Sequence, residues 1–297
     1  MKVVIVWVVT CLIWSTVWLF IKLGLRDLPP VSFAGIRLII AFAILLPVIV
    51  IRRIQLPRNA RDWKLIAITG VILLGLNYGL VFWGARYISS GLTAVLQSAT
   101  PAFTLVFAHY LLPDEPFTLS KLAAIALGIV GVAVIFSDQL SVVGWSALLG
   151  SATVVAGALC VAFVYVVVKA YGSHLQPSVL TVGQMICALI PLMIFGLIRE
   201  GNPLTFRWTT TAVVSLLYLA LAGSVAAFWL NYWLLKRMDA TKVMAMSLIE
   251  PFLAVVLGSI VLGETLTIHS LLGGAFILVS IGLILKRQIK EPAQAEA

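Results

Sequence analysis

A single carboxylate stands inside a long apolar run in the stretch SLIEPFLAVVL, residues 247–257. This residue, Glu250, directly precedes Pro251, and it alone of the eleven acidic residues lies deep within such a run. A carboxylate in a low-dielectric environment is costly, so Glu250 should face the protein interior or water. Three roles are open: a partner for backbone groups that Pro251 leaves unsatisfied, a site of proton or cation coupling, or a partner for a substrate amine.

Arg37 is the corresponding basic residue, because it lies about two turns into another apolar run and is too deep for a loop charge. Its long stem allows the guanidinium to snorkel outward or to pair within the protein. The planar guanidinium is also well shaped to bind a substrate carboxylate. The sequence leaves the structural and the substrate-binding interpretations open.

Neutral polar and aromatic side chains follow helical spacing in several other apolar runs. Each one is explained by interhelical hydrogen bonding or packing, but together they predict an internal cavity. With Arg37 as the sole deep cation, such a cavity suits amphipathic zwitterions or aromatic metabolites better than phosphorylated ones. The predicted lining residues are Trp14, Trp18, Asn77, Tyr78, Gln97, Thr100, Ser224, Phe228 and Asn231, with Gln97 and Thr100 on one helix face.

Motifs for enzymatic or cofactor chemistry are missing from the sequence. The three histidines are scattered, the three cysteines show no C-x-x-C spacing, and no G-x-x-x-x-G-K-[ST] phosphate loop occurs. We therefore expect no metal, no cofactor and no catalytic residues.

The elements that must position these residues are membrane-spanning helices. Of the 297 residues 62% are hydrophobic and 10% charged, far above the apolar content of about 45–50% in soluble proteins. Runs of this length cross a bilayer as helices, which predicts an all-α polytopic membrane protein. The ten predicted spans are 3–21, 31–51, 65–85, 92–112, 120–137, 144–168, 177–198, 211–235, 241–262 and 269–285.

The net charge of +9 is a topology signal, not a nucleic-acid footprint. With ten spans and the N-terminus inside, fourteen of the twenty basic residues fall in inner segments and five in outer ones. Both termini are thus predicted to be cytoplasmic, and no nucleic acid is expected as a partner. The expected location is the cytoplasmic membrane of a prokaryote.

The two halves of the chain share a pattern. An offset of 150 aligns Pro101 with Pro251 and Asp114 with Glu264, and an offset of 147 aligns Arg37 with Gln184. Five spans per half invert the second copy relative to the first, which is the physical basis of alternating access. We predict one repeat over 1–140, a second over 141–288 and a cytoplasmic tail over 289–297.

The stretches WSTVWLFIKLGLRDLPPVSFAGIRLIIA (14–41), RYISSGLTAVLQSATPAFTLVFAHYLLPDE (86–115) and ATKVMAMSLIEPFLAVVLGSIVLGE (240–264) resemble signatures of the EamA-like family of the drug/metabolite transporter superfamily. The first reads Trp14-Ser15 where that family frequently has Trp-Gly. The resemblance covers essentially the whole chain.

This resemblance implies a secondary transporter that exports amino acids or related metabolites, with protons as the candidate coupling ion. The alternatives are a uniporter or facilitator, an importer of another metabolite or drug, and a membrane-embedded enzyme. Lipid bilayer and a small-molecule substrate are the expected partners. Ten helices suffice to bury a site within one chain, so we expect a monomer, with a dimer left open.

Overall fold

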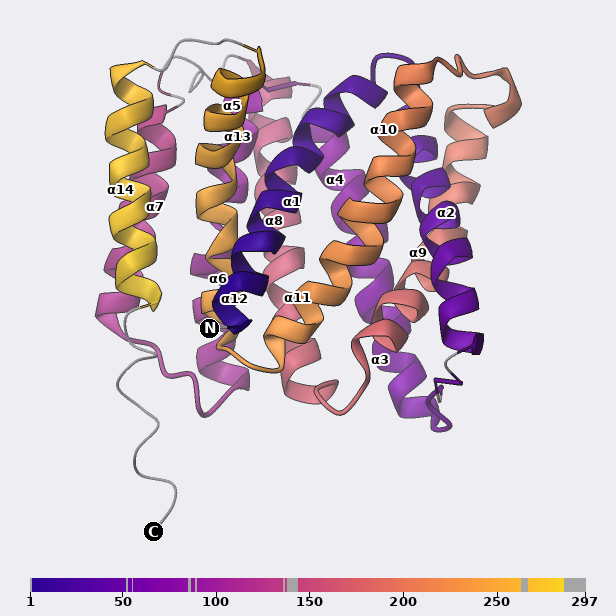
Figure 1. Ribbon diagram of the computed structural model, residues 1–297, viewed down its shortest axis with the longest axis horizontal. Helices are drawn as coiled ribbons and strands as arrows, with labels where there is room; N and C mark the ends of the chain where they lie inside the picture. Colours follow the sequence, from indigo (N-terminus) through magenta and orange to yellow (C-terminus); the bar gives the residue numbers. More distant parts are fainter. Residues whose placement is uncertain are drawn as a thin grey trace.

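The computed structural model describes residues 2–51, 53–54, 56–84, 87–88, 90–135, 137, 144–262 and 267–285. The predicted repeat boundary at 140/141, the predicted tail 289–297 and Glu264 lie outside these residues. Within them every regular element is helical, which confirms the all-α class. Figure 1 shows the helices running roughly side by side as one bundle.

Six helical stretches are long and apolar enough to cross a membrane, by length and composition. Shorter apolar helices, α7 and α14, accompany them. The α-helices are α1 (Lys2–Gly24), α2 (Pro30–Ile51), α3 (Ala60–Gly70), α4 (Asn77–Gly84), α5 (Ser90–Gln97), α6 (Thr100–Leu111), α7 (Leu119–Ile135), α8 (Trp145–Tyr171), α9 (Pro177–Arg199), α10 (Thr210–Ala220), α11 (Ala227–Leu235), α12 (Ala240–Met244), α13 (Met246–Leu262) and α14 (Ile268–Leu285).

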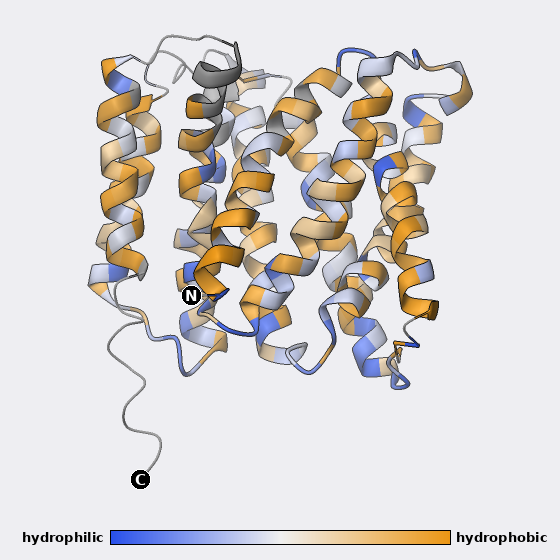
Figure 2. Ribbon diagram, in the orientation of Figure 1, coloured by the Kyte–Doolittle hydropathy of each residue, from blue (hydrophilic) through white to orange (hydrophobic). Residues whose placement is uncertain are grey.

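Apolar side chains cover the outside of the bundle as well as its core. Ile51, Leu119 and Ile198 are all at least 75% exposed, and Figure 2 shows hydrophobic residues along the helices with polar ones gathered at their ends. An apolar exterior of this extent is expected where the solvent is lipid. The chain is a multi-pass membrane protein.

Two of the predicted spans contain wide turns. A π-helical segment, Val71–Leu76, joins α3 to α4, and a second, Leu221–Ala226, joins α10 to α11. The two segments lie 150 residues apart, the same offset that aligns Pro101 with Pro251. π-Helical turns are rare and occur frequently at functional sites.

Two other predicted spans, 92–112 and 241–262, each contain a break in the helix. α5 ends at Gln97 and α6 begins at Thr100, while α12 and α13 are separated at Ala245. The cause is visible in the first case. Pro101 has no N–H to donate to the carbonyl of Gln97 four residues earlier, and the Thr100 hydroxyl donates to that carbonyl instead (2.7 Å).

The packing pairs helices from opposite ends of the sequence. α1 packs against α10, α11 and α13, whereas α8 packs against α4, α5 and α6. α2 contacts α9 and the Leu221–Ala226 segment, and α9 contacts α3 and the Val71–Leu76 segment. α7 and α14 pair at one side of the bundle (Figure 1). Side chains from both halves therefore meet along the middle of the bundle.

Candidate functional site

Arg37 lies in the middle of this shared interior and is only 4% exposed. It sits on the eighth residue of α2, as deep as the sequence predicts. Its Nε donates to the Ser224 hydroxyl (2.7 Å) and its Nη2 to the carbonyl of Gly223 (2.9 Å). Both acceptors belong to the π-helical segment Leu221–Ala226, whose wide turn presents backbone carbonyls sideways.

The guanidinium also lies over an aromatic ring, with its carbon 5.7 Å from the centroid of Tyr78. A cation over a ring face is attracted to it, and more strongly where water is excluded. None of the ion pairs formed among the described residues includes Arg37. A buried cation held by neutral groups and a ring retains charge with which to attract an anion.

Gln184 occupies the position on α9 that aligns with Arg37, and it is 1% exposed. Its Nε2 donates to the Thr69 hydroxyl (2.8 Å), and its Oε1 accepts from the hydroxyl of Tyr232. A Cβ placed on Gly70 would lie 2.7 Å from the Gln184 Cα, so the two backbones touch at this point. Our sequence reasoning aligned Gln184 with Arg37 but did not predict Gln184, Thr69 or Tyr232 as site residues.

Tyrosines connect the two clusters. The rings of Tyr165 on α8 and Tyr232 on α11 are 5.8 Å apart between centroids, and both are almost fully buried. Tyr78, whose ring lies beneath Arg37, packs against the same hydrophobic core as both. Phenol groups from three helices thus surround the same interior region as Arg37. Tyr165 was not predicted, because an apolar run on α8 gave it no polar neighbours in sequence.

Glu250 on α13 is 9% exposed and borders this region. Its burial shows that it faces the protein interior, as expected. Pro251 lies inside α13, whereas Pro101 lies in the first turn of α6. Its structural, coupling and substrate-amine roles all remain hypotheses.

Two asparagines present unpartnered amide atoms. Asn231 on α11 is fully buried; its amide lies beside the Tyr165 hydroxyl but meets the usual distance and angle limits of a hydrogen bond with no group. Asn77 donates from Nδ2 to the carbonyl of Leu73 (3.2 Å), while its Oδ1 has no partner. Buried amides are normally satisfied, so such atoms are candidates for contact with a ligand or water.

The remaining predicted residues divide into two groups. Trp14 and Phe228 meet edge to face, with ring centroids 6.4 Å apart. Gln97 instead donates to the carbonyl of Val154 (3.3 Å), and Thr100 to its own chain. Because the helix breaks between them, the prediction that Gln97 and Thr100 share one face of a helix is wrong. Trp18 lies on α1, but its side chain is outside the described part of the structure.

The side chains described above offer the chemical groups that a small amphipathic anion or zwitterion would require. Arg37 supplies a guanidinium, the asparagines and tyrosines supply neutral hydrogen-bonding groups, and Trp14 and Phe228 supply an aromatic wall. Across the residues that the structure describes, no group of three or more His, Cys, Asp or Glu side chains could hold a metal ion.

Comparison with known proteins adds family evidence. The profile of the EamA-like transporter family matches residues 1–137 and 148–286. The uncharacterized transporter YoaV of Bacillus subtilis (strain 168) is 30% identical over 271 residues, covering 91% of this chain and 92% of YoaV.

Two relatives from Escherichia coli (strain K12) also match over most of their length. The uncharacterized inner membrane transporter YedA is 29% identical, covering 95% of this chain and 90% of its own. A probable amino-acid metabolite efflux pump is 26% identical, covering 91% and 90%. The crystal structure of a protein with 15% identity superposes with a TM-score of 0.83, over 96% of this chain and 98% of that one, and supports the fold.

Proposed function

The chain belongs to the EamA-like transporter family of the drug/metabolite transporter superfamily, and from this premise we propose that it exports amino acids or related small amphipathic metabolites across the cytoplasmic membrane of a prokaryote. It crosses that membrane ten times, as two inverted five-helix repeats with both termini in the cytoplasm. Transport proceeds by alternating access to the site around Arg37.

The observation that carries this proposal is the buried guanidinium of Arg37. It is held by Ser224 and Gly223 of a π-helical turn and by the ring of Tyr78, and no described ion pair neutralises it. A substrate carboxylate supplies the missing negative charge. The unpartnered Oδ1 of Asn77 and the buried amide of Asn231 offer hydrogen bonds to the rest of a polar substrate.

The proposed direction of transport rests on one relative. The proposed substrate class rests on that relative and on the residues around Arg37. The relative at 26% identity bears the name of a probable amino-acid metabolite efflux pump. A single deep Arg with neutral and aromatic neighbours suits a zwitterion, whereas a phosphorylated metabolite calls for several cations.

Alternating access is supported by the matched irregularities of the two halves. The two π-helical segments lie 150 residues apart. The helices α5 and α12 also begin 150 residues apart, and each of them ends at a break. Equivalent weak points in both halves give each half the same means of bending.

The test is efflux from proteoliposomes loaded with a mixture of labelled amino acids, comparing the parent chain with Arg37→Lys. Lysine keeps the charge but loses the planar fork, so we expect the apparent Michaelis constant to rise about ten-fold or more. Arg207→Lys is the matched control, since Arg207 is exposed and pairs loosely with Asp27 (3.6 Å). An unchanged constant in Arg37→Lys, or absence of efflux from the parent, contradicts the proposal.

A further inference from the structure

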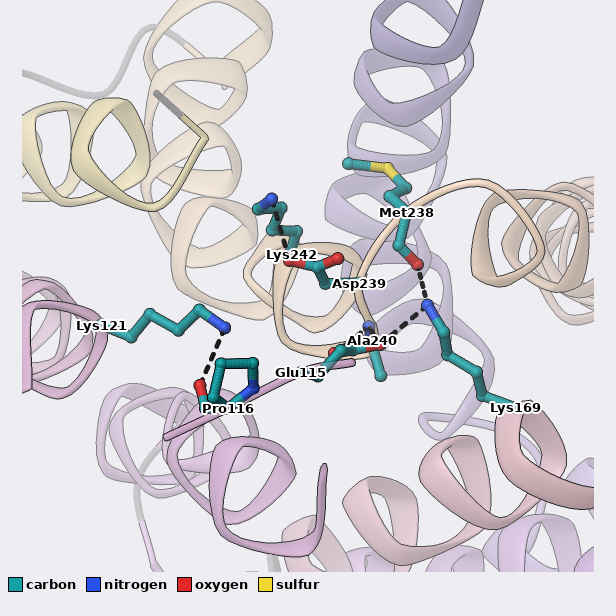
Figure 3. A network of polar contacts seen from close by, with 8 residues as sticks. All are labelled: Glu115, Pro116, Lys121, Lys169, Met238, Asp239, Ala240 and Lys242. Atoms are coloured by element: carbon teal, nitrogen blue, oxygen red, sulfur yellow. Dashed lines mark hydrogen bonds and ion pairs between the residues drawn. The ribbon is translucent and has the colours of Figure 1, made fainter. Parts of the chain in front are cut away.

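A second polar cluster closes one end of the bundle, far from Arg37 in sequence and built from different elements. We call this the basic end: it is where α1 begins, α8 ends and α12 begins, at the bottom of Figure 1. At its centre is Glu115, in the loop between α6 and α7, with a side chain only 4% exposed. Figure 3 shows this cluster from close by.

The Glu115 carboxylate binds two segments at once. Both of its oxygens accept from the backbone N–H of Ala240, at 3.0 and 2.9 Å. One of them also pairs with the Lys169 ammonium (2.8 Å), and Lys169 in turn donates to the carbonyl of Met238. A loop after α6, the end of α8 and the α11–α12 loop are thereby tied together (Figure 3).

Local capping does not explain this arrangement. Asp239 occupies the N-cap position of α12, yet its side chain makes no cap hydrogen bond. It pairs instead with Lys242 (2.8 Å) within its own turn. The N–H of Ala240, the first residue of α12, is satisfied instead by Glu115, 125 residues away.

The segment behind the cluster is sealed. All five residues of α12, Ala240–Met244, are buried. The Trp7 indole donates to the carbonyl of Lys242 (3.1 Å) and ties α1 to the same segment. Glu115 therefore binds the first N–H of a segment whose residues are all buried.

An ion pair at this place suits a contact that breaks and re-forms. Burying two charges gives little net stabilisation relative to apolar packing, because desolvation offsets their attraction. When the segments part, water replaces the lost partners of both ions, so separation is inexpensive. The contact between α7 and α14, with a close backbone approach at Gly131 and Gly273 and a buried Ser280–Ala124 hydrogen bond, suits a permanent interface.

We propose that Glu115, Lys169 and the Ala240 N–H form the gate on the cytoplasmic side, drawn here in its closed state. The proposal rests on the proposed function for the transport cycle and for the cytoplasmic location of the basic end. Opening separates the α6–α7 loop from α8 and α12 and admits substrate between them.

The test measures access to α12 with a membrane-impermeant maleimide. Thr241, 1% exposed and with an unpartnered hydroxyl, becomes the reporter as Thr241→Cys in a chain whose three cysteines are replaced by alanine. This reporter chain, the parent for the variants below, should react slowly with the maleimide in inside-out vesicles. Lys169→Met should speed labelling about five-fold or more, and Glu115→Gln, which keeps an acceptor for Ala240, should speed it less.

Two further variants separate a gate from general loosening. Lys242→Met removes a more buried lysine whose ion pair bridges no segments, and labelling should stay at the parental rate. The charge swap Glu115→Lys with Lys169→Glu restores the pair and should label more slowly than Lys169→Met. Equal acceleration by Lys242→Met, or none by Lys169→Met, overturns the gate. The thermal unfolding temperature of each purified variant identifies a misfolded chain.

Labelling requires no substrate, so its outcome is separate from that of the efflux assay. Accelerated labelling without amino-acid efflux supports the gate and contradicts the proposed substrate class. Acceleration only from the outer side in right-side-out vesicles supports a gate at the basic end and contradicts the proposed orientation.

Discussion

Arg37 and Gln184 lie 147 residues apart and make corresponding contacts in the two halves of the chain. Arg37 donates to Ser224 within one π-helical segment, and Gln184 donates to Thr69, two residues before the other. Each side chain comes from the second helix of its half and reaches the third helix of the opposite half. One position is charged and the other neutral, so the two halves are not chemically equivalent around the site.

The Gln184 contact should behave as a coupled pair. Thr69→Val leaves the Gln184 amide without its acceptor, at a cost of about 1–3 kcal/mol in the free energy of unfolding. Gln184→Leu made in the Thr69→Val background should cost less than it does alone. Reversible unfolding in detergent measures both steps, and additive costs would show that the hydrogen bond carries no coupling energy.

A substitution at Pro101 should restore the helical hydrogen bond that is missing between α5 and α6. Pro101→Ala supplies the N–H that the Gln97 carbonyl lacks, so the unfolding temperature should rise while the transport rate falls. Thr100→Val should destabilise the parent by about 1 kcal/mol, because it removes the substitute donor. The same substitution in the Pro101→Ala chain should cost clearly less. A transport rate unchanged by Pro101→Ala would show that the break has no part in the cycle.

The contact between α7 and α14 depends on glycine. A Cβ on Gly131 would lie 2.7 Å from the carbonyl oxygen of Gly273, which belongs to backbone and has no rotamer to adopt. Gly131→Ala should therefore lower the unfolding temperature despite the better helix propensity of alanine. Gly282→Ala, with no atom within 4 Å of the new Cβ, is the control and should be neutral or stabilising by up to about 1 kcal/mol.

A substitution of Glu250 should distinguish a role in proton coupling from a structural role. If it carries a coupling proton, Glu250→Gln abolishes efflux driven by a pH gradient and leaves substrate exchange intact, because exchange needs no net proton movement. Reconstituted vesicles with and without an imposed gradient measure both rates. Equal loss of both rates, together with a lower unfolding temperature, favours the structural role, and unaltered driven efflux excludes coupling.

The sequence predicted the features that follow from the high free-energy cost of placing a charge in lipid. A lone Arg or Glu within an apolar run is expensive in lipid, so the depth of Arg37 and the burial of Glu250 were readable from their neighbours alone. Spacing between Pro101 and Pro251 indicated the repeat offset that the π-helical segments also show.

Features that depend on partners far away in sequence were not predicted. The π-helical turns have no residue signature in VILLGL or LAGSVA, and Tyr232 gains its role only by facing Gln184. Glu115 was not predicted to have a role, although it accepts from the first N–H of a helix 125 residues away. Nothing local to Glu115 encodes Ala240, so only the folded packing reveals the contact.

Each π-helical segment also holds an extra residue relative to an α-helix of the same length. A π-helical turn accommodates more residues than an α-helical turn, so a helix that converts one into the other advances its neighbours by about one residue, or roughly 1.5 Å, and turns them through about 100°. Ser224 belongs to one such turn, and Asn231 follows it on α11. Rewinding Leu221–Ala226 would therefore rotate these two side chains relative to each other and shift α11 relative to α10.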